Sequence, residues 1–281
     1  MTQRLIPATL LAVFAFVSTA GADTRVTVTP KVARPGDAVL VTVTGAKDTP
    51  KGEAGGVGLK FYRARRGFQA VFAVRLDAKA EPIAVAIDGA AKPATVKVKA
   101  VTFPEAKVVV EEEMANPAKP ERDRIDADNK AILDAVAGAA APLFVKPFLR
   151  PRGRVSSIFG EWRTFNDGHR SQHLGFDIIA REGAKVAAIN AGTVVLVRDG
   201  FLTGQSVVIA HGGGISSAYY HLSQTLVAEG DKVARGATIG LVGSTGRTTG
   251  PHLHLSVRVP GGFVDPTTFL RLKLTPAVPK P

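Results

Sequence analysis

The sequence predicts a mainly β protein in which two strand-rich regions are joined by a single helix. Alternating apolar and polar residues over residues 24–110 predict the first region, and apolar residues at helical spacing after Glu121 predict the helix. From Phe148 onward, short apolar runs are again separated by turns, which predicts the second region. The 29 glycines, the 18 prolines and an aromatic content of 6% are also typical of short strands and turns.

The N-terminal region, residues 23–110, is predicted to be an immunoglobulin-like β-sandwich that serves as an accessory domain. Its clearest strands are short and separated by turns rich in Gly, Pro and Asp: 26–29, 39–44, 71–76, 83–87 and 96–101. The glycine-rich stretch 52–58 is expected to be a loop. The region has no histidine and no cluster of acidic residues suited to catalysis, so we expect it to act as a spacer or docking module.

Residues 111–147 are predicted to form a linker that contains one amphipathic helix. The acidic run 111–113 and two nearby prolines indicate a solvated turn. Over residues 121–140, Ile125, Ile132, Leu133 and Val136 recur at helical spacing among charged residues. We therefore expect one face of this helix to pack on a neighbouring element.

The first 22 residues are predicted to be a signal peptide. Arg4 supplies the positive charge, residues 5–17 are uncharged and mostly apolar, and residues 20–22 are small, as a signal peptidase requires. The apolar run is shorter than the ~20 residues of a membrane-spanning helix, which favours cleavage over an uncleaved anchor. The chain also has no cysteine, which fits an oxidising compartment and excludes thiolate metal ligands. The sequence thus predicts export to the periplasm or the cell envelope, without a stable membrane span.

The formal net charge of +12 favours acidic partners. The sequence contains no recognition helix, zinc finger or aromatic RNA-binding signature, so nucleic acid is not the expected partner. For an exported protein, anionic polymers of the envelope are the simpler partners, and a contribution to solubility alone is the other interpretation.

The C-terminal region, residues 148–272, contains a short internal repeat and is followed by a tail, residues 273–281. The repeat consists of residues 182–187 (EGAKVA) and 229–234 (EGDKVA). Two similar β units folded against each other predict a sandwich or a flattened barrel.

All six histidines lie in this C-terminal region, and their spacing predicts a metal site. His173 and Asp177 are four residues apart before a strand-like run, and an even offset on a strand would point both side chains to one face. His252 and His254, two residues apart at the start of another strand-like run, should likewise share a face, with Leu253 on the other. Imidazole and carboxylate groups are ligands of zinc, and a catalytic zinc keeps one position for water.

These residues belong to a series of motifs that resembles the lysostaphin/LytM-type zinc metallopeptidases, which cleave peptides of the bacterial cell wall. The resemblance covers about residues 148–270, and the motifs occur in the family's order: VSSIFG (155–160), HLGFD (173–177), YYHL (219–222), GDKV (230–233), GSTGRTTGPHLH (243–254) and VDP (264–266). Residues 24–147 more loosely resemble the β-rich region and helical connector that accompany this peptidase in some exported bacterial proteins.

The resemblance implies an antiparallel β-sheet domain of the duplicated hybrid motif, barrel-sandwich type, with one zinc ion per chain. It implies that His173, Asp177 and His254 are the zinc ligands, that His252 is catalytic and that His221 is its partner. An imidazole can accept the proton of an attacking water because its pKa of about 6.5 lies near working pH. Which of His221 and His252 takes that proton stays open at this point.

Other residues near these motifs are weaker candidates for the site. Tyr219 shares strand parity with His221 and is expected to face the cleft as a substrate-binding residue, with Tyr220 in the core. His211 is expected to be structural or to lie at the cleft edge, where it is a second candidate for substrate binding, and His169 is expected to be a solvated loop residue. The glycine-rich segment 243–250 is expected to be a flexible wall beside the substrate.

The resemblance therefore predicts an exported zinc endopeptidase that hydrolyses peptide bonds of bacterial peptidoglycan. Nothing in the sequence resembles a glycosidase's pair of carboxylates. Relatives cut either glycine bridges or direct cross-links, and the absence of a separate wall-targeting module favours a D-amino-acid-containing cross-link. The alternative is a catalytically silent or latent wall-binding regulator of another hydrolase, but such proteins typically lose residues that are all present here.

Overall fold

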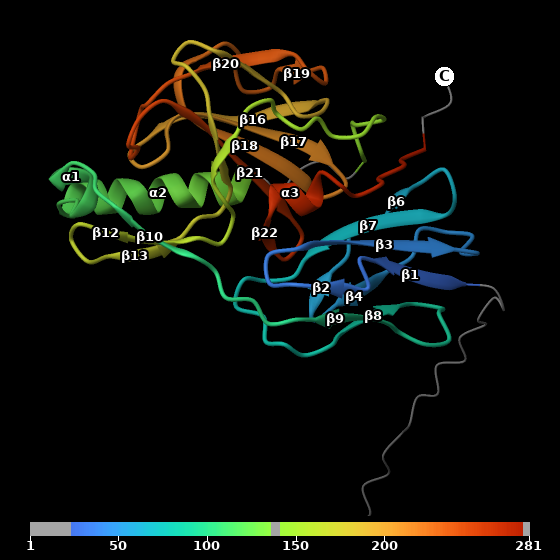
Figure 1. The fold of residues 1–281 in the computed structure, drawn as a ribbon. Helices are drawn as coiled ribbons and strands as arrows, with labels where there is room; N and C mark the ends of the chain where they lie inside the picture. The colour runs from blue at the N-terminus through green and yellow to red at the C-terminus, as the bar shows by residue number, and fades with distance from the viewer. Residues whose placement is uncertain (1–23, 136–140, 278–281) are drawn as a thin grey trace, which may run out of the picture.

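The computed structural model describes residues 24–135 and 141–277. The predicted signal peptide lies outside the described residues. Within them, no helix is long and apolar enough to cross a membrane. The fold is mainly β, with several sheets and few helices (Figure 1).

Two sheets form the N-terminal part of the fold and enclose a common apolar core. The first has the order β1 (Arg25–Thr29), β3 (Ala38–Thr44), β7 (Phe68–Ala73), β6 (Tyr62–Arg63). The second has the order β2 (Val32–Ala33), β9 (Ala94–Val98), β8 (Ile83–Ile87), β4 (Gly52–Ala54), β5 (Val57–Gly58). Val41 and Phe72 from the first sheet pack with Val85 and Val96 from the second. The stretch 52–58, expected as a loop, instead forms the β4–β5 hairpin, because its glycines Gly55 and Gly56 adopt the positive φ that the tight turn requires.

The structure departs from expectation at the end of the predicted sandwich, residues 105–108, and at the start of the predicted linker. β10 (Glu105–Val108) pairs in parallel with β12 (Trp162–Phe165) rather than with the N-terminal sheets. The acidic run then leads into a short helix, α1 (Glu112–Ala115), in place of a solvated turn. The second helix, α2 (Lys119–Ala135), covers the expected helical stretch as far as residue 135, and the rest of that stretch lies outside the described residues.

Helix α2 lies along the large C-terminal sheet, to which it is anchored by one buried carboxylate and one apolar residue (Figure 1). Asp128 accepts a hydrogen bond from Arg198 Nε (2.5 Å) and another from the backbone amide of Phe201 (2.8 Å). Ile132 packs in a small apolar cluster with Val208 and Tyr220 of the sheet. The amphipathic helix thus packs on a neighbour through its apolar residues, as the sequence predicts.

The large C-terminal sheet has ten strands and carries most of the histidines. Its central order is β11 (Val155–Ser157), β14 (Phe176–Ile179), β21 (His252–Val259), β18 (Ile215–Thr225), β17 (Gly204–Gly212), β16 (Gly192–Gly200), β19 (Lys232–Val233). Three further strands attach to it: β15 (Lys185–Ala187), β20 (Thr238–Val242) and β22 (Gly262–Val264). A separate sheet of three strands, β10-β12-β13, with β13 at Arg170–Gln172, lies beside α2 (Figure 1), and the short helix α3 (Pro266–Phe269) follows β22.

The two copies of the repeat adopt similar local structures in this sheet. Each forms a turn at its glycine and then a short strand, β15 in one copy and β19 in the other. Val186 and Val233, at equivalent positions, are both buried in the main core. The common sequence therefore marks a turn that returns an edge strand to the core.

The N-terminal and C-terminal parts share one continuous apolar core. Leu40, Tyr62 and Val71 from the N-terminal sheet belong to the same buried cluster as Phe144 and Phe269. The ring of Tyr62 meets that of Phe144 edge-on, with 5.8 Å between centroids. Backbone hydrogen bonds also join the segment after α3 to the edge strand β6, for example from the amide of Ala277 to the carbonyl of Arg63 (2.9 Å). The two parts are therefore packed as one body.

Candidate metal centre

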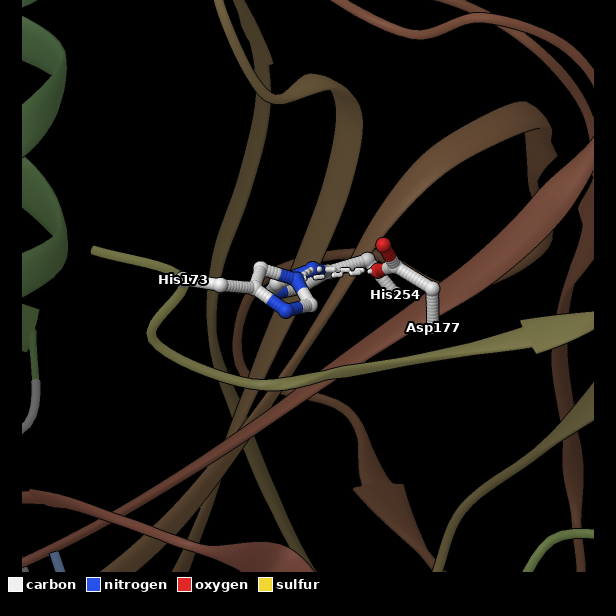
Figure 2. A group of neighbouring side chains, drawn as sticks. All are labelled: His173, Asp177 and His254. Carbon is white, nitrogen blue, oxygen red and sulfur yellow. Dashed lines mark hydrogen bonds and ion pairs between the residues drawn. The ribbon is translucent and has the colours of Figure 1, made fainter. Parts of the chain in front are cut away.

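His173, Asp177 and His254 come together at one point of the large sheet, with their side chains converging (Figure 2). Asp177 on β14 and His254 on β21 are directly opposite each other in the antiparallel ladder, so their side chains lie on the same face. Oδ1 of Asp177 lies 2.9 Å from Nδ1 of His254 and 3.1 Å from Nε2 of His173. His173 Nε2 and His254 Nδ1 are 2.9 Å apart.

His173 reaches this point by a route that differs from the predicted one. It lies in the loop between β13 and β14, not on a strand, so strand parity does not orient it. The loop brings the chain close to His254: a Cβ atom on Gly175 would lie 2.5 Å from Nε2 of that histidine. Glycine is therefore required two residues before Asp177, because any side chain would push His254 out of place.

The three facing atoms fit a metal ion because all three are acceptors. Nδ1 of His173 lies 2.9 Å from the carbonyl oxygen of Ile158, which can only accept, so the proton is on Nδ1 and the lone pair on Nε2. Ser256 Oγ donates to the Leu174 carbonyl (2.7 Å) and so accepts from Nε2 of His254 (2.8 Å), which leaves the lone pair on Nδ1. Three atoms with free lone pairs therefore face one another with no proton between them. Such atoms are suited to be the ligands of a transition-metal cation.

Two further imidazoles border this point, and the backbone orients both in the same way. His252, on β21, donates from Nδ1 to the Gly250 carbonyl (2.8 Å), and its Nε2 lies 3.5 Å from Oδ1 of Asp177. His221, on β18, donates from Nδ1 to the Thr245 carbonyl (2.8 Å). Its ring centroid is 4.9 Å from that of His252. Each of these imidazoles thus keeps the lone pair of Nε2 free for a proton.

The loop between β20 and β21, residues 243–250, holds both imidazoles. Besides its carbonyls at Thr245 and Gly250, it places Thr248 Oγ1 at 3.2 Å from Nδ1 of His252. The loop is fixed in turn, since Thr245 Oγ1 donates to the Leu222 carbonyl (2.7 Å) and accepts from the Gln205 amide (2.9 Å). The segment expected to be a flexible wall is therefore a hydrogen-bonded support for the site.

The expected orientation of Tyr219 is wrong, whereas Tyr220 lies in a small apolar cluster, as expected, and also contacts the site. Tyr219 is opposite Leu255 in the ladder and is fully buried in the core, while Tyr220 is opposite His254 and stacks on it, with centroids 5.1 Å apart. The parity argument fails because His221 has a φ of 62°, a left-handed conformation that interrupts the alternation. Tyr220 and His221 consequently both face the site.

His211 lies in the protein interior, where its hydrogen bonds indicate a structural role, and it does not reach the metal centre. It is fully buried, donates from Nδ1 to the Ala191 carbonyl (2.8 Å) and lies 2.8 Å from Ser217 Oγ. Ser217 Oγ in turn lies 3.0 Å from the hydroxyl of Tyr219, which accepts from the Ile189 amide (2.8 Å). Tyr219 and His211, both considered for substrate binding, thus form one internal network. His169 is exposed, as expected of a solvated loop residue.

Arg163, which no sequence motif indicated, contacts the metal centre directly. Its Nη2 donates to Oδ2 of Asp177 (2.5 Å) and to Ser157 Oγ (2.9 Å), and its Nε lies 3.4 Å from Glu161. The guanidinium therefore holds one carboxylate oxygen and turns the other toward the two imidazoles. Only the pairing of β12 with β13 and β10 places Arg163 beside Asp177, so spacing along the chain could not reveal it.

A cavity of about 970 Å³ opens over these side chains. The large sheet and the loop 243–250 contribute His221, His252 and Tyr220 to its lining. Residues 106–110, in and after β10, and Ile132 and Leu133 of α2 also line it. The connector between the two strand-rich regions thus borders the site.

Burial keeps His221 and His254 neutral. Burial lowers the pKa of His254 to about 4. Burial, together with the nearby charges of His254 and His252 when protonated, lowers the pKa of His221 to about 3. Both groups therefore have free lone pairs at neutral pH, which is the form that binds a metal or accepts a proton.

A β-sheet protein with a His-Asp-His metal-binding group and two uncommitted imidazoles at a cavity has the features of a metallopeptidase. The sequence pattern of Peptidase family M23 matches residues 171–266. That segment contains the three donors and both flanking imidazoles, and the C-terminal part of this chain is therefore an M23 metallopeptidase domain.

Two curated relatives and one solved structure show how far the similarity extends. Peptidoglycan DD-endopeptidase ShyA of Vibrio cholerae is 42% identical over 113 residues, which are 40% of this chain and 26% of that protein. DD-carboxypeptidase/endopeptidase Mpg of Neisseria meningitidis is 35% identical over 144 residues, 51% of this chain and 31% of that protein. The crystal structure of a Pseudomonas aeruginosa protein described as an M23 peptidase is also similar, with a TM-score of 0.63. The two sequences are 27% identical, and the match covers 84% of this chain and 94% of the other chain. The chain spans about a third or less of the length of the two curated relatives.

Proposed function

We propose that this protein is a zinc-dependent endopeptidase that hydrolyses peptide cross-links or stem peptides of bacterial peptidoglycan. The observation that carries the proposal is the convergence of three lone-pair atoms next to two imidazoles that are free to accept a proton. We assign one zinc ion per chain to His173, Asp177 and His254. When bound, the ion supplies a positive charge that polarises the scissile carbonyl and acidifies water.

The two flanking imidazoles handle the proton of the attacking water. Both rings have a free Nε2, and we assign the proton to Nε2 of His252 because that atom lies next to the Asp177 carboxylate. The carboxylate of Asp177, 3.5 Å away, then stabilises the positive charge on the ring. Nε2 of His252 can afterwards deliver the proton to the leaving amine. Nε2 of His221 accepts a hydrogen bond from the same water and orients it.

The bond we propose is one between two D-configured centres in a direct cross-link, rather than a glycine bridge. The names of both curated relatives specify DD activity, and one of them is also a DD-carboxypeptidase. In such a substrate the residue on the amine side of the scissile bond carries a free carboxylate. Peptidoglycan is also an anionic envelope polymer, which suits the net charge of +12.

The remaining parts of the chain fit an exported enzyme with an accessory region. We propose an immunoglobulin-like sandwich at 23–110, a connector at 111–147, a peptidase domain of the duplicated hybrid motif type at 148–272 and a short tail at 273–281. We also propose that residues 1–22 are a cleaved signal peptide, so that the enzyme acts in the periplasm or envelope. Edman sequencing of the exported protein should begin at Asp23.

Digestion of purified sacculi tests the proposed activity and its bond. The zinc-loaded protein should release peptide fragments and leave glycan strands intact, as seen by mass spectrometry of the soluble products. The appearance of new reducing sugar ends would overturn the peptidase assignment. Cleavage of glycine bridges with intact direct cross-links would overturn the choice of bond.

The rival function, a silent or latent wall-binding regulator, has one observation in its favour, since β10 and α2 border the cavity. A catalytically silent protein would lack a metal ligand or a flanking imidazole, and all five of these side chains are present. Latency would show as wall binding without hydrolysis in the zinc-loaded protein, together with hydrolysis once the anchor of α2 is weakened by Asp128→Ala. Hydrolysis by the unmodified protein would rule out both forms of the rival.

A further inference from the structure

The cavity is lined by a positively charged side chain, that of Arg247, which has no role in the proposed hydrolysis. Arg247 lies in the loop between β20 and β21, and its guanidinium carbon lies 4.0 Å from the ring centroid of Phe165. Arg247 is half-buried and lines the cavity. Within residues 24–135 and 141–277, no carboxylate lies within ion-pair distance of it and its guanidinium makes no hydrogen bond.

The neighbouring arginines differ because their charges are already paired. Arg163 is bound to Asp177 and Glu161. Arg170 lies over the ring of Trp162, 4.4 Å from its centroid, and forms an ion pair with Glu105 outside the cavity. Burial lowers the pKa of Arg247, the nearby charge of Arg163 lowers it further, and the charge of Asp167 raises it. An arginine keeps its charge under these conditions, so the cavity presents an uncompensated cation.

Arg247 belongs to the loop that holds the reacting imidazoles. The same loop holds His221 through the Thr245 carbonyl and His252 through Thr248 Oγ1 and the Gly250 carbonyl. Arg247 lies between these residues in the chain, and its own backbone amide donates to the Leu202 carbonyl (2.9 Å). The aromatic face of Phe165 fixes the plane of the guanidinium. The cation is thus preorganised in the wall that orients both imidazoles.

We infer that Arg247 binds the free carboxylate of the substrate on the amine side of the scissile bond and makes the enzyme selective for acidic peptides. The inference rests on the proposed function, whose DD cross-link carries such a carboxylate. A guanidinium binds a carboxylate through two parallel hydrogen bonds, which gives both affinity and orientation. The carboxylate also supplies the counter-charge that the cavity lacks.

A pair of substrates that differ by one group tests this assignment. The first is a synthetic cross-linked peptide with a D-alanyl scissile bond and a free α-carboxylate on the residue at the amine side. The second carries a primary carboxamide at that position and is otherwise identical. Because a neutral amide cannot replace the charge-assisted pair, the zinc-loaded protein should cleave the acid at least about tenfold more efficiently in kcat/KM.

Three variants separate carboxylate binding from a purely structural stacking role. Arg247→Gln should lower kcat/KM for the acid by about tenfold or more and leave the carboxamide within about threefold, which removes the preference. Arg247→Lys keeps a charge without the planar fork and should retain part of the preference. Arg170→Gln, a matched arginine over an aromatic ring outside the cavity, should leave the preference unchanged.

Equilibrium binding keeps the test independent of turnover. The dissociation constants of both peptides are measured on zinc-loaded His252→Ala and on the double variant with Arg247→Gln. A preference for the acid that disappears with Arg247→Gln supports the inference even if no cleavage occurs, whereas absence of cleavage by the unmodified protein counts against the proposed function. Equal losses for both peptides in Arg247→Gln, or no preference in the unmodified protein, would overturn the inference.

Discussion

His252 and His254 are two residues apart on one strand, and the hydrogen-bond partner of each ring determines its chemistry. Ser256 accepts from Nε2 of His254, so that ring presents Nδ1 to Asp177 and His173. The Gly250 carbonyl accepts from Nδ1 of His252, so that ring presents Nε2. Two rings on the same face therefore present different nitrogens, one suited to hold a metal and one suited to take a proton.

Substitution of these two histidines should separate metal binding from catalysis. His254→Ala removes one of three donors, and zinc content after dialysis should fall from one per chain to near zero. His252→Ala leaves all three donors, so zinc should stay bound while kcat/KM for wall peptides falls by about 10²- to 10⁴-fold. Atomic absorption and peptide hydrolysis measure the two quantities. Loss of zinc in His252→Ala alone would show that the assigned roles are reversed.

The buried His211 should make the stability of the protein depend on pH in the acid range. Burial lowers its pKa to about 4 in the folded state, against about 6.5 when the chain is unfolded. The unfolded state therefore binds a proton more readily, and stability is lost as the pH falls from about 6.5 toward 4. By linkage this single group contributes roughly 3 kcal/mol over that window.

Urea unfolding between pH 7 and pH 4.5 would measure the contribution of His211. His211→Asn keeps a donor toward the Ala191 carbonyl but has no titrating ring, so its stability should fall less steeply with pH than that of the unmodified protein. Parallel curves for the two proteins would mean that His211 does not titrate in this range.

At the scale of elements, α2 and the loop 243–250 enclose the site from two sides. The loop belongs to the large sheet and is held by its hydrogen bonds. Helix α2 is attached mainly through Asp128 and Ile132, each buried against β16 or its neighbours. Because a helix with few anchors is easier to displace than a strand in a sheet, we expect α2 to control access to the cavity.

Weakening the Asp128 anchor should expose the metal centre. Asp128→Ala leaves Arg198 and the Phe201 amide without their acceptor, at a cost of about 1–3 kcal/mol in the free energy of unfolding. The rate at which a chelator removes zinc should rise. Asp134→Asn is the matched control, because the Asp134 side chain is 65% exposed in its pair with Lys130. Equal chelation rates in both variants would show that α2 does not cover the site.

At the scale of the whole molecule, the shared core joins the N-terminal sheets to the peptidase part. Tyr62 packs on Phe144, and Gln69 accepts from the Thr275 amide (2.8 Å). The amide of Ala73 donates to the Pro260 carbonyl (2.9 Å). Apolar packing and hydrogen bonds thus cross between the two parts at several places, so neither should unfold without exposing apolar surface of the other.

Calorimetry should accordingly show one cooperative unfolding transition. Tyr62→Ala removes a buried ring from the shared core and should lower the free energy of unfolding by about 3–5 kcal/mol without splitting the transition. Val109→Ala is the control, because Val109 is 76% exposed. Two separate transitions, of which only one shifts in Tyr62→Ala, would contradict the shared core.

The sequence by itself determined the strand-rich regions and the connecting helix, because these depend on local alternation. It grouped His173, Asp177 and His254 through the resemblance of its motifs to a peptidase family. It also placed Leu253 on the face opposite the two histidines, where the structure buries it in the core, since alternation holds along β21.

Only the tertiary structure decided the features that depend on non-local pairing or on one unusual backbone angle. The left-handed φ of His221 leaves Tyr219 buried in the core instead of facing the cleft, and Tyr220 instead stacks on His254. The pairing of β12 with β10 and β13 brings Arg163 to Asp177, and the cavity leaves Arg247 without a counter-charge. No pattern in the chain encodes such contacts, because their energy depends on which distant groups share a low-dielectric space.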